Sequence, residues 1–112
     1  MADTLPYEIP PSFLGLYQRR GRLRPGVTAR EVAAHYEACE DLAQALTEQA
    51  RERQFSLGVT EADVLVRMHR GLAQPESGLS LAQAWWVTHR LAELLGWPCP
   101  LPDTPPEDPS DA

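Results

Sequence analysis

The chain has 112 residues, a formal net charge of −6 and 43% hydrophobic residues, which is the size and composition of one globular domain. The sequence has no apolar run of about 20 residues and no signal-peptide pattern at its start, and two cysteines are too few for a disulfide-dense secreted scaffold. We therefore expect a cytoplasmic, single-domain protein without a membrane segment. All ten basic residues are arginine, and a chain without lysine cannot form the usual phosphate-binding loop.

The N-terminal part of the chain carries weak structural signals. Residues 1–10 lack a hydrophobic period and are expected to be flexible, with Pro10 and Pro11 marking the edge of the folded part. The segment 12–18, SFLGLYQ, predicts one or two helical turns that pack Phe13 and Tyr17 onto the remaining fold.

The strongest element is a long helix over about 29–57. Thr28 and Glu31 form a T-x-x-E capping box, and Gly58 supplies the C-terminal stop. Between them, apolar or small side chains recur three and four residues apart and predict one buried stripe. Its members are Val32, Tyr36, Cys39, Ala43, Leu46, Ala50 and Leu57.

Two shorter helices are predicted over about 61–73 and 81–95. Thr60 with Asp63 and Ser80 with Gln83 repeat the same capping pattern at their starts. No segment alternates with period two, and no Asn-Gly or Asp-Gly hairpin turn occurs. We therefore predict an all-α fold in which residues 11–98 form a single helical domain, a small bundle folded across the long helix. An antiparallel dimer of two long helices from two copies is the alternative.

The C-terminal segment 99–112 is predicted to be a disordered tail. Six of the eleven prolines fall in the last fifteen residues, together with four carboxylates. Proline at this density prevents a helix, and few apolar side chains are available to offset the ordering entropy.

The most distinctive charge feature is a cluster of five arginines in twelve residues without an acid among them: Arg19, Arg20, Arg22, Arg24 and Arg30. Guanidinium groups bind phosphates and carboxylates alike. The cluster therefore fits three interpretations, namely a nucleic-acid contact, internal pairing with the acidic long helix or tail, and an acidic patch on a protein partner. The net charge of −6 weighs against nucleic acid, because non-specific affinity comes from phosphate neutralisation.

Trp85 and Trp86 are neighbours and lie about 100° apart around a helix, so they cannot both centre on one face. One of them is expected in the core, and the sequence does not decide which. Trp86 lines up with Arg90, and both residue types are enriched at binding hot spots. A local Trp86–Arg90 stack or partly buried packing are the alternatives.

Glu31, His35 and Cys39 stand four residues apart and so share one helix face. His35 and Cys39 could hold a transition metal, with Glu31 as a third ligand. The simpler interpretation is that Cys39 is a small buried residue of the apolar stripe. Cys99, between two prolines, is expected to be an exposed, unpaired thiol.

Several segments together resemble a family of proteobacterial proteins of about 100 residues without an established function, often labelled as an ATPase with chaperone activity. The similarity covers about residues 8–97. The segments are IPPSF (9–13), HYEACEDLAQALTE (35–48), GVTEADVL (58–65), HRGL (69–72) and HRLAELLGW (89–97). The chain has none of the nucleotide-binding motifs that this label requires, so the resemblance implies at most an association with a larger chaperone ATPase.

The leading hypothesis is a small bacterial interaction or adaptor module without catalytic activity or cofactor, since no catalytic constellation is present. Its partner is expected to be another protein or a second copy. The candidate contact residues are Arg19, Arg20, Arg22, Arg24, Trp86 and Arg90. A nucleic-acid-binding regulator that uses the arginines of 19–30 is the alternative, and a metal or redox protein acting through His35 and Cys39 is the third hypothesis.

Overall fold

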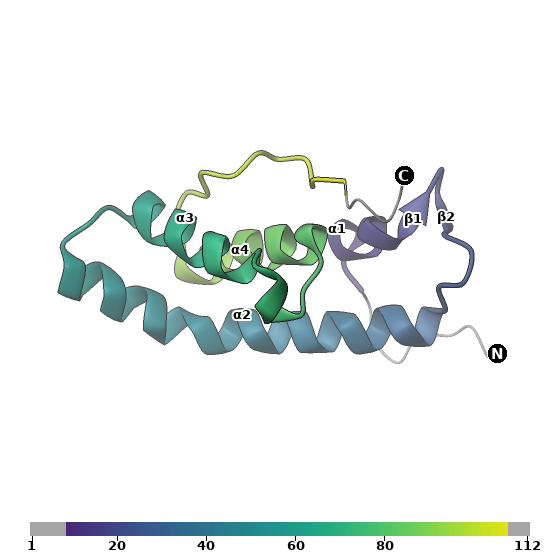
Figure 1. The fold of residues 1–112 in the computed structure, drawn as a ribbon, viewed down its shortest axis with the longest axis horizontal. Coiled ribbons are helices and arrows are strands. Elements are labelled where there is room, and N and C mark those ends of the chain that lie inside the picture. Colours follow the sequence, from purple (N-terminus) through teal and green to yellow (C-terminus); the bar gives the residue numbers. More distant parts are fainter. Residues whose placement is uncertain (1–8, 108–112) are drawn as a thin grey trace.

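The computed structural model describes residues 9–107, so the predictions for residues 1–8 and 108–112 lie outside the described part of the chain. The architecture is mostly α-helical with one small hairpin (Figure 1). The elements in chain order are α1 (Pro11–Leu14), the 3-10 turn η1 (Gly15–Tyr17), β1 (Gln18–Arg19), β2 (Arg22–Leu23), α2 (Ala29–Leu57), α3 (Glu61–Leu72), the 3-10 turn η2 (Pro75–Ser77) and α4 (Leu81–Leu95).

The predicted long helix is confirmed as α2. The Thr28 hydroxyl accepts a hydrogen bond from the Glu31 amide, and the Glu31 carboxylate accepts one from the Thr28 amide, which satisfies two amides that lack helical partners. Gly58 ends the helix with a φ of 67°, a conformation that glycine adopts without strain. At 1.5 Å per residue, α2 is about 43 Å long and runs along the 50 Å axis of the molecule (Figure 1).

The helices α3 and α4 also begin where their capping residues predict. Ser80 and Gln83 form a complete capping box at α4. At α3 the Thr60 hydroxyl accepts from the Asp63 amide, whereas the Asp63 carboxylate pairs with Arg67 one turn later at 2.7 Å. Both helices pack against α2 and against each other.

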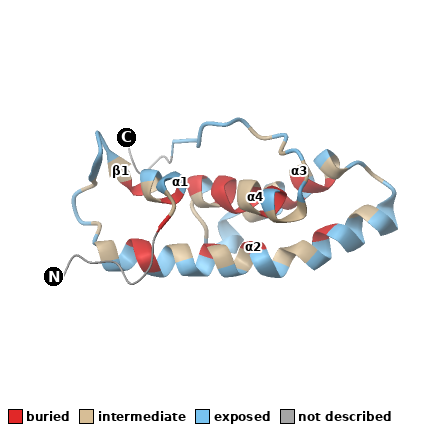
Figure 2. Ribbon diagram, turned by 180° about the vertical axis from the view of Figure 1, so that it is seen from behind, coloured by how far each residue is buried: buried red, intermediate tan, exposed pale blue. Residues whose placement is uncertain are grey.

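The core consists of two clusters arranged along α2, and Leu46 contacts both. One cluster joins α1, η1, α2 and α4 around the fully buried Phe13. The other joins α2, α3 and α4 around Leu65 and Leu91. Figure 2 shows the buried residues concentrated on the facing sides of α2 and α4.

The prediction of an all-α fold is wrong in one detail, since β1 and β2 form an antiparallel hairpin in which Arg19 pairs with Arg22. The two linking residues, Arg20 and Gly21, have φ angles of 55° and 79°. A two-residue hairpin turn of this kind needs positive φ at both positions. The chain uses Arg-Gly where Asn-Gly or Asp-Gly is the usual signal, so the sequence pattern does not indicate this hairpin.

The buried stripe of α2 ends earlier than predicted. Ala50 is its last buried residue, and Leu57, predicted in the stripe, is 53% exposed. Phe55 is 89% exposed at the same end. The shorter α3 and α4 do not cover the last turns of α2, which is why this apolar surface remains open. No helix within residues 9–107 is long and apolar enough to cross a membrane.

Residues 99–107 contain no helix or strand, as the proline-rich composition predicts, and they run back over α4 toward β1 (Figure 1). Leu101 and Cys99 pack against the two core clusters. Ile9, within the segment expected to be flexible, is likewise buried against the first cluster. An extended proline-rich segment still has carbonyl acceptors and apolar side chains. The contacts that these groups make with α4 and the core hold residues 99–102 in place.

Candidate interaction surface

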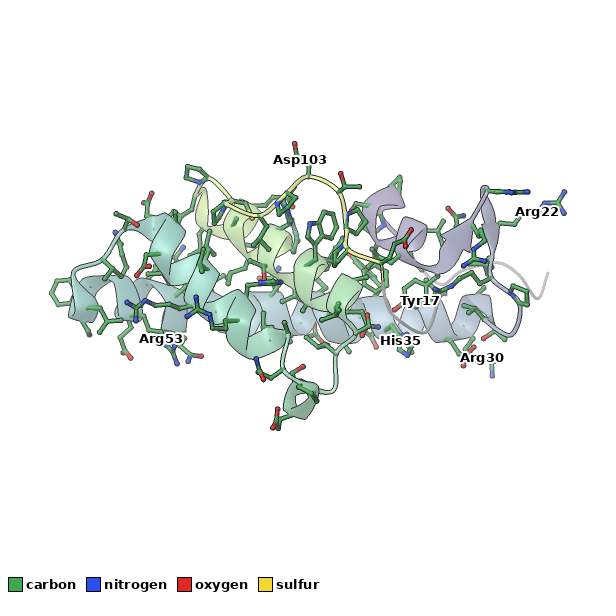
Figure 3. All side chains as sticks on the ribbon, turned by 45° about the horizontal axis from the view of Figure 1, so that its top comes forward. Tyr17, Arg22, Arg30, His35, Arg53 and Asp103 are labelled. Carbon is green, nitrogen blue, oxygen red and sulfur yellow. The ribbon has the colours of Figure 1, made fainter. Side chains whose placement is uncertain are left out.

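The arginine cluster lies at one end of the molecule, on the β1–β2 hairpin and the first turn of α2. Arg22 and Arg30 lie at this end in Figure 3, whereas Arg53 lies at the opposite end. Arg19, Arg20 and Arg22 are exposed, and Arg24 is half-buried. The tight turn at Arg20 and Gly21 therefore concentrates the positive charge that the sequence distributes over residues 19–24. We call residues 19–24 the arginine hairpin.

The arginine hairpin is held to the helices by Tyr17, which directly precedes β1. The buried Tyr17 hydroxyl accepts a hydrogen bond from Gln83 Nε2 of α4 at 2.6 Å and lies 2.9 Å from His35 Nδ1 of α2. Figure 3 shows Tyr17 and His35 side by side. The Arg24 amide also donates to the Tyr17 carbonyl at 2.9 Å. Tyr17 thus connects the base of the hairpin to both α2 and α4.

Arg20 and Arg22, at the tip of the hairpin, do not form ion pairs with the acidic face of α2 in the described part of the chain. Glu40, one of the acids of that face, pairs with Arg90 instead. Within residues 9–107 the structure records no ion pair of Arg20 or Arg22. Arg19 and Arg24 line a depression of about 270 Å³ together with Pro105, Pro106 and Glu107 of the tail.

Trp86, predicted as a contact residue, is buried in the core and is 4% exposed. Its ring makes edge contacts with Phe13 and Tyr36 at centroid distances of 5.0 and 5.9 Å. Its indole Nε1 donates to the Ser12 hydroxyl at 3.0 Å. The helical turn α1 covers this face of α4, so Trp86 is a packing residue and not an exposed anchor.

Arg90, the second residue proposed on α4, is held in an internal ion pair. Its Nε and Nη2 donate to the two carboxylate oxygens of Glu40 at 2.8 and 3.0 Å, and Nη1 donates to Glu93 at 3.2 Å. The Arg90 hydrogen bonds lower the pKa of Glu40. This two-pronged geometry joins α4 to α2, and Arg90 is therefore a structural residue in this chain.

Trp85, which sequence reasoning did not propose, makes the contact that most resembles ligand recognition. Its indole Nε1 donates to the carbonyl oxygen of Pro102 at 2.8 Å, and His89 Nε2 lies 2.9 Å from the same oxygen. The two rings pack with centroids 4.5 Å apart. The signal that could have found this contact is a tryptophan-rich helix followed directly by a proline-rich segment, because aromatic surfaces dock such segments.

Beside this contact lies an open cavity of about 430 Å³, between the N-terminal segment, α2, α4 and the tail. Its walls include Ser12, Tyr36, His89, Arg90 and Asp103. Burial raises the pKa of the Tyr36 phenol above its ordinary value of 10.0, and a neutral phenol can both donate and accept hydrogen bonds. The cavity is lined by both aromatic and charged side chains.

The metal and redox hypothesis depended on His35 and Cys39. Cys39 is 2% exposed, and burial raises the pKa of its thiol to about 11. A protonated, enclosed thiol is a poor ligand and a poor nucleophile. His35 lies at the surface and interacts with Tyr17. Residues 9–107 contain no group of three His, Cys, Asp or Glu side chains that could hold a metal.

The fold and this surface define a small, mostly α-helical protein with a basic hairpin at one end and a proline-rich segment docked along one helix. No protein-family model, no curated protein and no solved structure matches the chain.

Proposed function

We propose that this protein is a small helical adaptor, without catalytic activity of its own, that docks an acidic surface of a partner protein through the arginine hairpin. The observation that carries this proposal is the exposed position of Arg20 and Arg22 on the hairpin, where the described residues form no ion pair with either side chain. Guanidinium groups presented on a tight turn match carboxylates with two parallel hydrogen bonds.

The anchoring of the hairpin supports the proposal. Tyr17 connects the hairpin base to α2 and α4, so the backbone that carries the arginines is held in place before a partner binds. A preorganised backbone loses less conformational entropy on binding and therefore favours tighter binding. The resemblance to proteins labelled as chaperone ATPases makes a larger chaperone ATPase the first partner to test.

Charge reversal at the hairpin tests the proposal. Arg20→Glu with Arg22→Glu should remove specific partners captured from a native bacterial lysate. Arg51→Glu with Arg53→Glu is the matched control, because it makes the same charge change on exposed residues of α2 at the opposite end. Equal partner sets for wild type and the hairpin variant, or equal losses in both variants, would contradict the proposal.

Binding of nucleic acid is the competing function, because the same arginines could neutralise phosphates. It predicts retardation of DNA or RNA in a gel at low salt and a steep loss of binding as salt rises. Retardation that disappears in the Arg20→Glu, Arg22→Glu variant would replace the protein-partner proposal. No retardation of either nucleic acid would remove the alternative.

A further inference from the structure

The tail segment 98–107 lies on α4 in an extended path (Figure 1), and one backbone carbonyl anchors it. The Pro102 oxygen receives the Trp85 Nε1 hydrogen at 2.8 Å and lies 2.9 Å from His89 Nε2. A carbonyl oxygen only accepts hydrogen bonds, so His89 acts as a second donor to this oxygen when its Nε2 carries the proton. Trp85 is 8% exposed with the tail in place.

This arrangement has the chemistry by which proteins recognise proline-rich segments. Such segments are extended before they bind, and they dock on aromatic side chains. The anchoring group is a main-chain carbonyl, which any extended segment can supply. Residues 102–107 are all exposed, so another segment of the same chemistry can replace this part of the tail.

Charge extends the match beyond Pro102. The tail continues to the arginine hairpin, where Pro105, Pro106 and Glu107 line the 270 Å³ depression together with Arg19 and Arg24. The surface therefore offers an aromatic pair with N–H donors at one end and guanidinium groups at the other. Its complement is a proline-rich segment with acidic residues after the anchoring carbonyl.

We propose that Trp85 and His89, together with Arg19 and Arg24, form a docking surface for an extended, proline-rich, acidic segment of a partner protein. The chain's own residues 98–107 occupy this surface intramolecularly. This inference rests on the proposed adaptor function, because it specifies the chemistry of the partner that the adaptor binds. Because the tail is tethered, its effective concentration is in the millimolar range, and a partner segment must displace it.

The test uses the full chain and a fluorescein-labelled peptide of residues 98–107, with binding followed by fluorescence anisotropy. Leu101→Asp weakens docking of the chain's own tail, because Leu101 packs against the first core cluster. This variant should bind the labelled peptide at least tenfold more tightly than wild type. Adding Trp85→Phe, which removes the indole N–H and keeps a ring, should weaken binding at least fivefold.

Two further variants make the result specific. His89→Leu removes the other donor from a partly exposed position and should also weaken binding in the Leu101→Asp chain. Trp97→Phe is the matched control, because Trp97 packs against the second cluster; it should leave the affinity within twofold. Far-UV circular dichroism confirms folding, and the His89→Leu variant decides the matter if Trp85→Phe fails to fold.

Three results would overturn the inference. The first is equal peptide affinity of wild type and Leu101→Asp, and the second is an affinity unaffected by both Trp85→Phe and His89→Leu. The third is dimerisation of wild type that Trp85→Phe abolishes, which would assign the surface to the tail of a second copy. If the peptide binds as expected while the Arg20→Glu, Arg22→Glu variant captures the same partners as wild type, that combination would refute the adaptor proposal alone. Loss of captured partners in that variant without the expected peptide binding would refute this inference alone.

Discussion

The Arg90–Glu40 ion pair joins α4 to α2, and its removal is the most informative stability test. The side chains of Arg90 and Glu40 are 32% and 17% exposed, and two hydrogen bonds of 2.8 and 3.0 Å connect them. Hydrogen bonds to charged groups contribute about 1.5–3 kcal/mol to stability. We expect Glu40→Gln, which keeps the shape and removes the charge, to lower the free energy of unfolding by about this amount at pH 7.

Glu93→Gln is the matched control, because Glu93 contacts the same guanidinium but is 70% exposed. An exposed pair contributes about 0.2–1 kcal/mol. Urea unfolding followed by circular dichroism measures both losses. Equal losses in the two variants would refute the assignment of Arg90 as a residue that joins the helices.

The same pair predicts a pH dependence. The pKa of Glu40 is lowered from its ordinary value of 4.5, mainly because Arg90 donates hydrogen bonds to the carboxylate. A lowered carboxyl pKa stabilises the folded state at pH values above the ordinary one, and this contribution is lost as the pH falls through the folded-state value. The stability difference between wild type and Glu40→Gln should therefore shrink as the pH falls below 4.5. A difference that stays constant down to about pH 3 would contradict this reasoning.

Three further predictions follow from single contacts. Thr28→Ala removes the cap of α2 and should lower the free energy of unfolding by about 1 kcal/mol in urea melts. Gly21→Ala, at a φ of 79°, should cost about 1–2 kcal/mol in the same assay, whereas an unchanged stability would exclude the hairpin turn. In native protein Ellman's reagent should modify the partly exposed Cys99 before the buried Cys39, and equal rates would contradict the burial of Cys39.

The helices could be predicted from the sequence because their signals are local. The capping residues Thr28, Thr60 and Ser80 fix the starts of α2, α3 and α4, and Gly58 and Gly96 end α2 and α4 with left-handed conformations. Each signal acts within four residues and needs no knowledge of tertiary packing.

The hairpin and the tail contact could not be predicted in the same way. Arg20 adopts a φ of 55° that non-glycine residues seldom adopt, so its conformation depends on the strands on either side. The contact at Pro102 is made by its main-chain carbonyl oxygen. Every residue has such an oxygen, so the amino-acid sequence gives no signal for this contact. The expectation that only one of Trp85 and Trp86 lies in the core was wrong for the same reason: both are buried, because α1 covers the Trp86 ring and the tail covers the Trp85 ring.

The role of the arginines in binding stays a prediction. Arg19, Arg20 and Arg22 lie exposed on the β1–β2 hairpin and Arg24 is half-buried beside it, but their spacing in the sequence did not indicate the turn. Residue type suggested Trp86 and Arg90 as partner contacts. Within the fold, however, the Trp86 ring packs against Phe13 and the Arg90 guanidinium pairs with Glu40. Residue type indicates that a side chain can bind a partner. Only the tertiary packing decides whether that side chain is exposed or already bound to another residue of the same chain.

Photo-crosslinking in bacterial cells tests the central claim most directly, because it compares the two ends of the molecule in one experiment. A benzophenone amino acid replaces either the exposed Pro25, next to the arginine hairpin, or Phe55, which is 89% exposed at the opposite end. Our account predicts protein adducts from position 25 that disappear after Arg20→Glu and Arg22→Glu. Adducts from position 55 with none from position 25 would contradict it.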